Sequence, residues 1–329
     1  MKKNWLLYFL IAGLGVLLFT APRLFSAESW GTVPDVPTAL SPASVVQSAP
    51  VRSAPVRSAL KYETYTLPTS TVHVVRIPPE GGFQVKPAVA SEVETVANFA
   101  QQQQAIAVIN GGFFDPVNHK TTSYIVLQGE VVADPAENER LVTNPDMIPY
   151  LDRILNRSEF RQYRCGNTIQ GNTIQGNTIQ NIIQYDIAAH DELVPSGCEL
   201  VYSLGAGPRL RPSLDLEAEA FAEVVQGEMV RDALGSSRPN ARSAVGITPE
   251  GEVILVMAAQ QANAPTESGV SLPELAEFLG TLGVNEAMNL DGGSSASLYY
   301  QGQTYFGKVD ADGNPVERSV KSVLMVVEG

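Results

Sequence analysis

Residues 287–298 read AMNLDGGSSASL, an apolar run that ends in a turn rich in glycine and serine. The apolar residues predict a short buried strand that delivers Asn289 and Asp291 to the turn. Exposed amides and two hydroxyls there could bind an anion, and Asp291 supplies a carboxylate. That carboxylate is a candidate acid or base, nucleophile or metal ligand. The alternative is a hairpin turn in which Asp291 bonds its own backbone.

A second glycine-rich loop, INGGFFDP, spans residues 109–116. A β-rich run ends at Asn110, and the two glycines that follow permit backbone angles and close approaches that a side chain would forbid. Phe113 and Phe114 offer an apolar wall, and Asp115 ends the turn. The alternative is a glycine-rich turn whose phenylalanines belong to the core.

A third segment, RPNARSAVGI at residues 238–247, leads into the predicted strand 253–258. Arg242 is followed by two small residues, so its guanidinium could reach into a crevice. The planar guanidinium fork suits a phosphate or a carboxylate. The alternative is an ordinary surface arginine.

Strand patterns are more numerous than helix patterns. Short β-rich runs predict strands at residues 62–67, 72–77, 105–109, 123–127, 253–258 and 320–327. Helices are predicted at residues 92–104, 151–164 and 272–282, the last starting at Ser271 and stopping at Gly283. We therefore expect an α+β fold, a single domain over residues 61–329 around a mixed β-sheet with a few flanking helices.

Five segments occur here in the order seen in one enzyme family. They are INGGFFDP, GAGPRL (205–210), ARSAVGIT (241–248), NLDGGSSASL (289–298) and ERSVKSVLMVV (317–327). Over residues 61–329 the chain thus resembles the phosphodiester glycosidase family. The resemblance implies a hydrolase that cleaves the anomeric C–O bond of a sugar-1-phosphodiester, with a glycan or sugar phosphodiester as its substrate.

The resemblance also implies roles for individual residues. The leaving phosphate monoester has a second pKa of about 6 and departs largely as an anion, so a cation and backbone amides that hold it supply much of the stabilisation. Arg242 and the glycine loops fit that role. Asp291 is the first choice, and Asp115 the second, for the carboxylate that activates water or attacks the sugar. The expected substrate-binding residues are Asn110, Gly111, Gly112, Phe113, Ser243, Asn289, Gly292, Gly293, Ser294 and Ser295.

Two other functions stay open at this point. One is a carbohydrate- or anion-binding surface module without catalysis, and the other is a metal-dependent phosphodiesterase. No cofactor is predicted, because the three histidines are scattered and lack zinc-site spacing. A divalent cation near Asp291 remains an open alternative.

The N-terminal residues 1–27 predict export. Lys2 and Lys3 precede Trp5–Ala21, a run without charge, and this pattern is typical of a signal peptide or an N-terminal membrane anchor. We expect a periplasmic or extracellular protein, secreted or anchored once by residues 5–21. Residues 28–60 are rich in Pro, Ser and Ala and repeat SAPVR, which predicts a disordered linker.

The body of the chain is strongly acidic. The first 60 residues hold five basic and two acidic residues, which leaves 17 basic and 33 acidic residues and a net charge of −16 in the rest. Such a body disfavours nucleic-acid binding, and an anionic substrate would have to be held by local features.

The two cysteines of this exported chain, Cys165 and Cys198, predict one disulfide. GNTIQ occurs three times between them, over residues 166–180. Residues 165–198 therefore read as a surface loop decorated with repeats.

Overall fold

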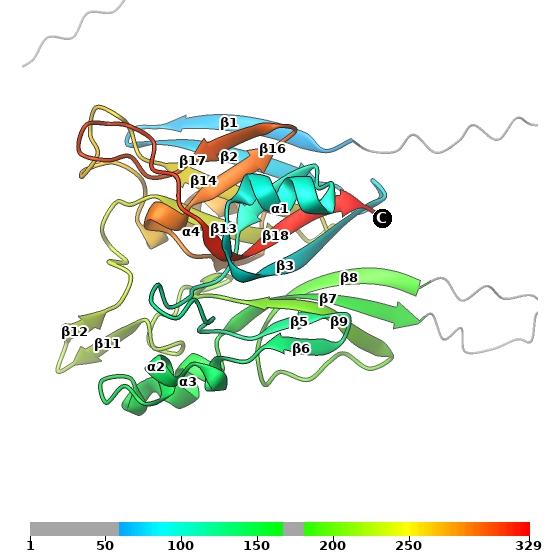
Figure 1. The fold of residues 1–329 in the computed structure, drawn as a ribbon, viewed down its shortest axis with the longest axis horizontal. Helices are drawn as coiled ribbons and strands as arrows, with labels where there is room; N and C mark the ends of the chain where they lie inside the picture. Colours follow the sequence, from blue (N-terminus) through cyan, green and yellow to red (C-terminus); the bar gives the residue numbers. More distant parts are fainter. Residues whose placement is uncertain (1–58, 167–180) are drawn as a thin grey trace, which may run out of the picture. The chain divides into compact units, whose positions relative to one another are not determined.

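Antiparallel β-sheets carry most of the fold. The computed structural model describes residues 59–166 and 181–329, and every strand pairing within these residues is antiparallel (Figure 1). The first sheet has six strands, in the order β1 (Lys61–Leu67), β2 (Ser70–Ile77), β14 (Val253–Ala259), β13 (Arg242–Ile247), β15 (Glu286–Asn289) and β10 (Arg209–Arg211).

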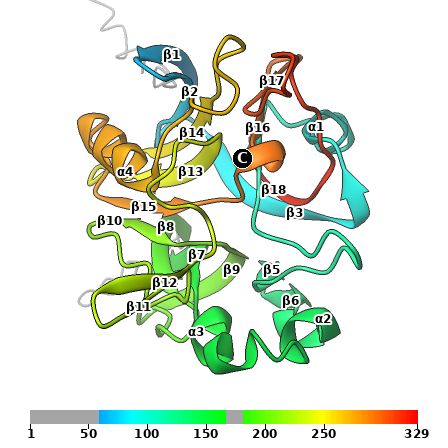
Figure 2. The same ribbon diagram turned by 90° about the vertical axis from the view of Figure 1, so that its left-hand side faces the viewer.

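Two five-stranded sheets and a hairpin complete the set. The second sheet has the order β17 (Gln303–Phe306), β16 (Ser297–Tyr300), β4 (Ala107–Asn110), β18 (Val320–Glu328) and β3 (Phe83–Glu94). The third has the order β6 (Glu130–Ala133), β5 (Ile125–Leu127), β9 (Cys198–Gly205), β7 (Ser158–Gly166) and β8 (Asn181–Ala189). The hairpin pairs β11 (Ala222–Val225) with β12 (Glu228–Asp232). Figure 2 shows the first two sheets side by side above the third.

The helices are few and short. They are α1 (Val96–Gln103), α2 (Glu139–Val142), α3 (Leu151–Leu155) and α4 (Leu272–Thr281), with 3₁₀ turns η1 (Pro135–Glu137), η2 (Ile148–Tyr150) and η3 (Gly293–Ser295). α4 starts as the sequence predicts: the Glu274 N–H donates to the Ser271 hydroxyl at 3.3 Å, and the Ser271 N–H donates to the Glu274 carboxylate at 2.8 Å. This capping box fixes the first turn.

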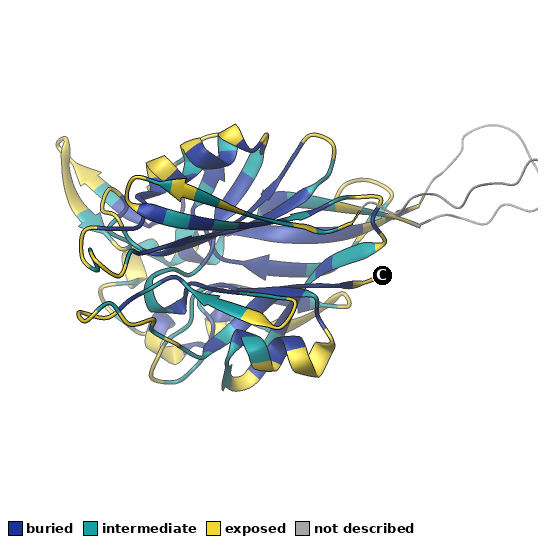
Figure 3. Cartoon of the chain, turned by 90° about the horizontal axis from the view of Figure 1, so that it is seen from above, coloured by how far each residue is buried: buried dark blue, intermediate teal, exposed yellow. Residues whose placement is uncertain are grey.

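One core joins the three sheets. Met257 of β14, Ile109 of β4 and Phe160 of β7 lie in a single buried cluster. The alternate residues of β14 face outward and are covered by α4, while α1 covers the outer face of the second sheet. Figure 3 shows the strands largely buried and exposure concentrated in loops and helices. Because both faces of β4, β14 and β18 are covered, the loops at their ends start from rigid positions.

The expected mixed sheet is corrected to several antiparallel sheets with few helices. The predicted helix 151–164 is also wrong beyond its start: α3 ends at Leu155 and β7 begins at Ser158. The helix prediction rests on Arg153, Arg157, Arg161 and Arg164, which recur at helical spacing. Phe160 and Tyr163 are fully buried in the sheet, and this burial outweighs that spacing. The helix predicted at 92–104 starts only at Val96, because β3 continues to Glu94.

The predicted disulfide is present. Cys165 and Cys198 are paired residues of β7 and β9, and their sulfur atoms are bonded. The described residues lie in one structural unit, Pro55–Gly329. The predicted leader and most of the predicted linker and GNTIQ repeats lie outside the described residues. Within the residues that are described, no helix has the length and apolar character needed to cross a membrane.

Candidate active site

The candidate site begins at Asn110, where the two glycine-rich loops meet. β4 ends at this residue, which is fully buried. The Ser243 hydroxyl of β13 donates to Asn110 Oδ1 at 2.6 Å, and Asn110 Nδ2 donates to the Asp291 carbonyl at 2.6 Å. One side chain therefore ties the second sheet, the first sheet and the Asp291 turn together.

Gly111 and Gly112 pass so close to neighbouring backbone that no side chain fits at either position. A Cβ atom on Gly111 would lie 2.5 Å from the Ser322 hydroxyl oxygen, and one on Gly112 would overlap the Gly205 carbonyl. The Gly111 N–H donates to the Ser322 carbonyl at 2.7 Å, and the Gly112 N–H donates to its hydroxyl at 3.2 Å. Both amides thus bond within the protein and are not free to bind the leaving phosphate, the role that the sequence predicted for them. The two glycines instead allow the backbones to pack closely.

Asp291 lies in the turn after β15 and is held by its backbone. Its N–H donates to the Gly111 carbonyl at 3.0 Å, and the Gly292 N–H donates to its Oδ1 at 2.9 Å. Burial raises the pKa of Asp291 to about 6. Hydrogen bonds from Ser295 and Gly292 and the charge of Arg318 oppose that rise. Such a carboxylate is ionised at neutral pH yet accepts a proton readily, which suits a general base or a nucleophile.

The cation beside this carboxylate is Arg318, which the sequence-based site did not include. Its Nη1 donates to the Ser294 hydroxyl at 3.0 Å, and its guanidinium carbon lies 5.3 Å from the centre of the Phe114 ring. Arg318 belongs to the ERSVKSVLMVV segment. That segment is one of the five that carry the family resemblance, so the sequence contained a signal for Arg318.

Arg242, the cation that the sequence predicted, is buried and bonded elsewhere. Its guanidinium donates to four backbone carbonyls, those of Val270, Leu234, Gly235 and Arg238, at 3.3, 3.1, 2.8 and 3.2 Å. The donors of this guanidinium are therefore not free to bind a phosphate. It fixes the loop before β13, and we assign it a structural role in place of the predicted one.

Asn289 connects the site to the GAGPRL segment. Its Nδ2 donates to the Gly207 carbonyl at 3.1 Å and to the Leu290 carbonyl at 2.6 Å, while the Gly207 N–H donates to the Asn289 carbonyl at 3.0 Å. Its buried Oδ1 has no hydrogen-bond partner among the described residues. An acceptor left in this state is an uncommon feature of a folded protein, and a substrate donor or a water molecule would satisfy it.

Asp115 is separate from this group. Its Oδ2 pairs with Arg140 Nε at 2.7 Å, and its Oδ1 accepts from the Val117 N–H at 2.7 Å. Burial opposes ionisation of Asp115, but the Val117 N–H and Arg140 outweigh it and hold its pKa below the ordinary value. Both oxygens of Asp115 thus have partners and its pKa is lowered, whereas the pKa of Asp291 is raised, so the structure favours Asp291 as the reacting carboxylate.

The other predicted site residues also make contacts within the protein. The Gly293 N–H donates to the Ala241 carbonyl at 2.8 Å, and a Cβ on Gly292 would lie 2.9 Å from that same oxygen. Phe113 packs on Phe221, with ring centres 5.6 Å apart. Across residues 59–166 and 181–329, no group of three or more His, Cys, Asp or Glu side chains is arranged to hold a metal ion.

One family model and several solved structures match this chain. Residues 212–327 match the family model of phosphodiester glycosidases. The resemblance to that family is confirmed. The matched segment contains Asn289, Asp291 and Arg318, whereas the Asn110–Phe113 loop lies before it. A search of the curated proteins found no match.

Solved structures share the fold of this phosphodiester glycosidase-like chain. The catalytic domain of zebrafish N-acetylglucosamine-1-phosphodiester alpha-N-acetylglucosaminidase, auto-inhibited by its pro-peptide, is 18% identical, with a TM-score of 0.56 over 82% of this chain and 83% of that one. A hypothetical protein from Synechocystis is 18% identical, with a TM-score of 0.51; the match covers 81% of this chain but spans only 61% of that protein. A protein from Burkholderia pseudomallei is 19% identical, with a TM-score of 0.52 over 78% and 74% of the two chains. At these identities the likeness shows the fold alone.

Proposed function

We propose that this protein is an exported glycosidase that hydrolyses the anomeric C–O bond of sugar-1-phosphodiesters in envelope or extracellular glycans. The observation that carries the proposal is the environment of Asp291. This carboxylate has a raised pKa, is fixed by backbone hydrogen bonds and lies beside a cation, within the segment that matches the family. Export rests on the basic and apolar leader.

Asp291 would supply the group that acts at the sugar. Its pKa of about 6 leaves it ionised at neutral pH. In that state it either takes a proton from the attacking water or attacks the anomeric carbon itself, opposite the departing oxygen. The bond between the anomeric carbon and the phosphate oxygen breaks, and the oxygen leaves with its electron pair as a phosphate monoester. Where Asp291 attacks directly, water then cleaves the glycosyl–Asp291 ester, which releases the free sugar and restores the carboxylate.

Arg318 would hold the phosphate in place of Arg242. Its guanidinium lies close enough to lower the pKa of Asp291 and is oriented by the Ser294 hydroxyl at 3.0 Å. Because the leaving phosphate is already an anion near neutral pH, charge stabilisation matters more here than proton donation. The acidic body gives no general attraction for such a substrate, so this local cation carries that task.

The test compares Asp291→Asn with Asp115→Asn in the full-length protein, using release of free sugar from several sugar-1-phosphodiesters. We expect the Asp291 variant to lose about a thousandfold in kcat, the scale typical of a removed catalytic carboxylate. The matched Asp115 variant should stay within a few-fold of wild type. Near-wild-type turnover by the Asp291 variant would contradict the assignment. Sugar release from no substrate would favour the non-catalytic binding module instead.

A further inference from the structure

A group of arginines lies beside the candidate site, and no role is yet assigned to it. Arg153 of α3, Arg157 just before β7 and Arg231 of β12 gather around the rings of Tyr150 and Phe221. We propose that this arginine cluster binds a second phosphate of the substrate, so that the natural substrate is a glycan with more than one phosphodiester. This inference rests on the proposed function and names its substrate class.

Arg157 is the central member. Its side chain is buried, with 8% of the residue exposed, and its guanidinium carbon lies 3.8 Å from the centre of the Phe221 ring. Only Nε has a hydrogen bond among the described residues, to the Glu219 carbonyl at 2.9 Å. Burial lowers the pKa of Arg157 to about 10, against the opposing charge of Glu219, so the group stays positive at neutral pH. A buried charge with only one hydrogen bond is costly, and an anion would supply partners for the two Nη atoms.

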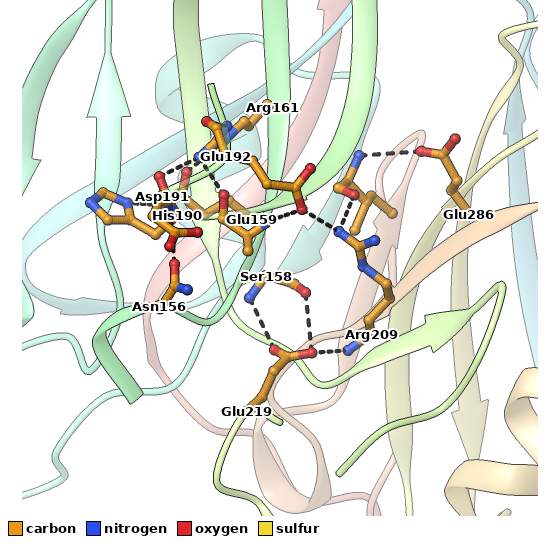
Figure 4. Close-up of polar contacts among 12 residues, drawn as sticks. Asn156, Ser158, Glu159, Arg161, His190, Asp191, Glu192, Arg209, Glu219 and Glu286 are labelled. Atoms are coloured by element: carbon orange, nitrogen blue, oxygen red, sulfur yellow. Dashed lines mark hydrogen bonds and ion pairs between the residues drawn. The ribbon is translucent and has the colours of Figure 1, made fainter. Parts of the chain in front are cut away.

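Glu219, whose charge acts on Arg157, does not form an ion pair with it. Glu219 accepts from the Ser158 N–H at 3.0 Å, from the Ser158 hydroxyl at 3.1 Å and from the Arg209 N–H at 2.6 Å (Figure 4). Three neutral donors thus hold its two oxygens against β7 and β10. Among the residues described, Arg157 forms no ion pair within 4.0 Å with Glu219 or any other acid.

The other two arginines have a similar environment. Their guanidinium carbons lie 5.3 Å (Arg153) and 4.7 Å (Arg231) from the centre of the Tyr150 ring. Each donates to a backbone carbonyl, Arg153 to Glu217 at 2.8 Å and Arg231 to Ala220 at 3.4 Å. Neither forms an ion pair in the part of the chain that the structure describes. The carboxylate of Glu223, the cross-strand partner of Arg231, accepts a hydrogen bond from the Tyr150 hydroxyl and forms no ion pair with an arginine of the cluster. Three guanidinium groups without an ion pair among the described residues, in a body of net charge −16, make a local site for phosphate oxygens.

Two packed aromatic rings, Phe221 and Phe113, connect the arginine cluster to the Asp291 site. Phe221 lies under Arg157 and packs on Phe113, the residue that follows Gly112. A Cβ on Gly207 would lie 3.1 Å from Phe221, and Gly207 is itself bonded to Asn289. Phe221 is buried, whereas Phe113 is half-buried. A chain of phosphodiester-linked sugars would therefore place one phosphate at Arg318 and another at the arginine cluster, with a sugar against Phe113.

The first test measures binding of tripolyphosphate to the full-length protein by calorimetry. We expect Arg157→Gln and Arg231→Gln each to weaken binding at least tenfold. The control Arg164→Gln changes an exposed arginine that already pairs with Glu199 and should change affinity less than twofold. Arg231 is half-buried on a hairpin, so its variant keeps the test valid where Arg157→Gln fails to fold. Unchanged binding by Arg231→Gln, or an equal loss in the control, would overturn the proposal.

The second test compares sugar-1-phosphodiesters that carry one or two phosphodiester groups. Arg231→Gln should raise KM at least tenfold for the longer substrate and less than twofold for the shorter one, with kcat unchanged for the shorter. Equal changes for both substrates would overturn the proposal. Where the wild type hydrolyses neither, the proposed function fails, while the tripolyphosphate measurement still decides whether the cluster binds phosphate.

Discussion

The Asp291 site and the arginine cluster satisfy their polar groups in opposite ways. Around Asp291 the four glycine amides, Asn110 and Arg242 all bond to partners within the protein. In the arginine cluster each of three cations lies over an aromatic ring and donates to one backbone carbonyl, and among the described residues none forms an ion pair. Internal bonding fixes one carboxylate in position, whereas unused donors are left for a ligand. The fixed carboxylate of the Asp291 site suits catalysis, and the unused donors of the arginine cluster suit phosphate binding.

The largest effect should come from Arg318, the cation that acts on the Asp291 carboxylate among the residues that the structure describes. We expect Arg318→Gln to lower kcat/KM for a sugar-1-phosphodiester by about 100- to 1000-fold, because a charge-assisted contact to the leaving phosphate is lost. Steady-state kinetics on the full-length protein measure this. A change below threefold would remove Arg318 from the mechanism.

The buried Arg242 should behave differently. Arg242→Met removes four hydrogen bonds to carbonyls. The Val270 and Gly235 carbonyls keep a backbone donor, whereas those of Leu234 and Arg238 lose theirs, so the free energy of unfolding should fall by about 3 kcal/mol. Denaturant unfolding measures this loss. The folded fraction should keep a KM close to that of wild type. A selective rise in KM with unchanged stability would restore the phosphate-binding role that the sequence predicted.

The raised pKa of Asp291 predicts a pH-dependent stability difference. The unfolded chain releases this proton near pH 4 and the folded protein only near pH 6, so ionisation of Asp291 costs the wild type stability as the pH rises between these values. From pH 4 to pH 7.5, Asp291→Asn should gain about 2 kcal/mol in free energy of unfolding relative to wild type. A difference independent of pH would show that the carboxylate titrates normally.

The same titration bears on activity. Because the ionised carboxylate is the reacting form, kcat/KM should fall as the pH drops through about 6. A pH profile of kcat/KM for a sugar-1-phosphodiester measures this limb. A profile that stays flat down to pH 4.5 would separate the activity from Asp291.

Much of the fold could be predicted where a strand pattern and burial agreed. The strands around residues 62–67, 253–258 and 320–327 and the capped helix α4 are examples, since their patterns are local. The α3–β7 region could not be predicted, because its arginines repeat at helical spacing while Phe160 and Tyr163 pair across strands distant in sequence. The pairing of β7 with β8 and β9 therefore determined that residues 158–166 form a strand.

The same limit applies to the site. Two short motifs were enough to predict that Asn110 and Asp291 belong to one site, because glycine-rich loops indicate close backbone approach. The choice between cations could not be made from sequence, since Arg242 and Arg318 have the same chemistry and differ only in what surrounds them. The spacing of Arg157 within a row of arginines is compatible with an anion-binding face or with an ordinary solvated one; the sequence cannot decide between them, because the lack of an ion pair is a property of the fold.

The central claim, cleavage at the anomeric carbon, is tested most directly by hydrolysis of a sugar-1-phosphodiester in water enriched in oxygen-18. Mass analysis of the wild-type products then shows which bond has broken. Attack at the sugar predicts that the heavy oxygen appears in the anomeric hydroxyl of the released sugar and that the phosphate stays unlabelled. Heavy oxygen in the phosphate would mean P–O cleavage and would contradict the account.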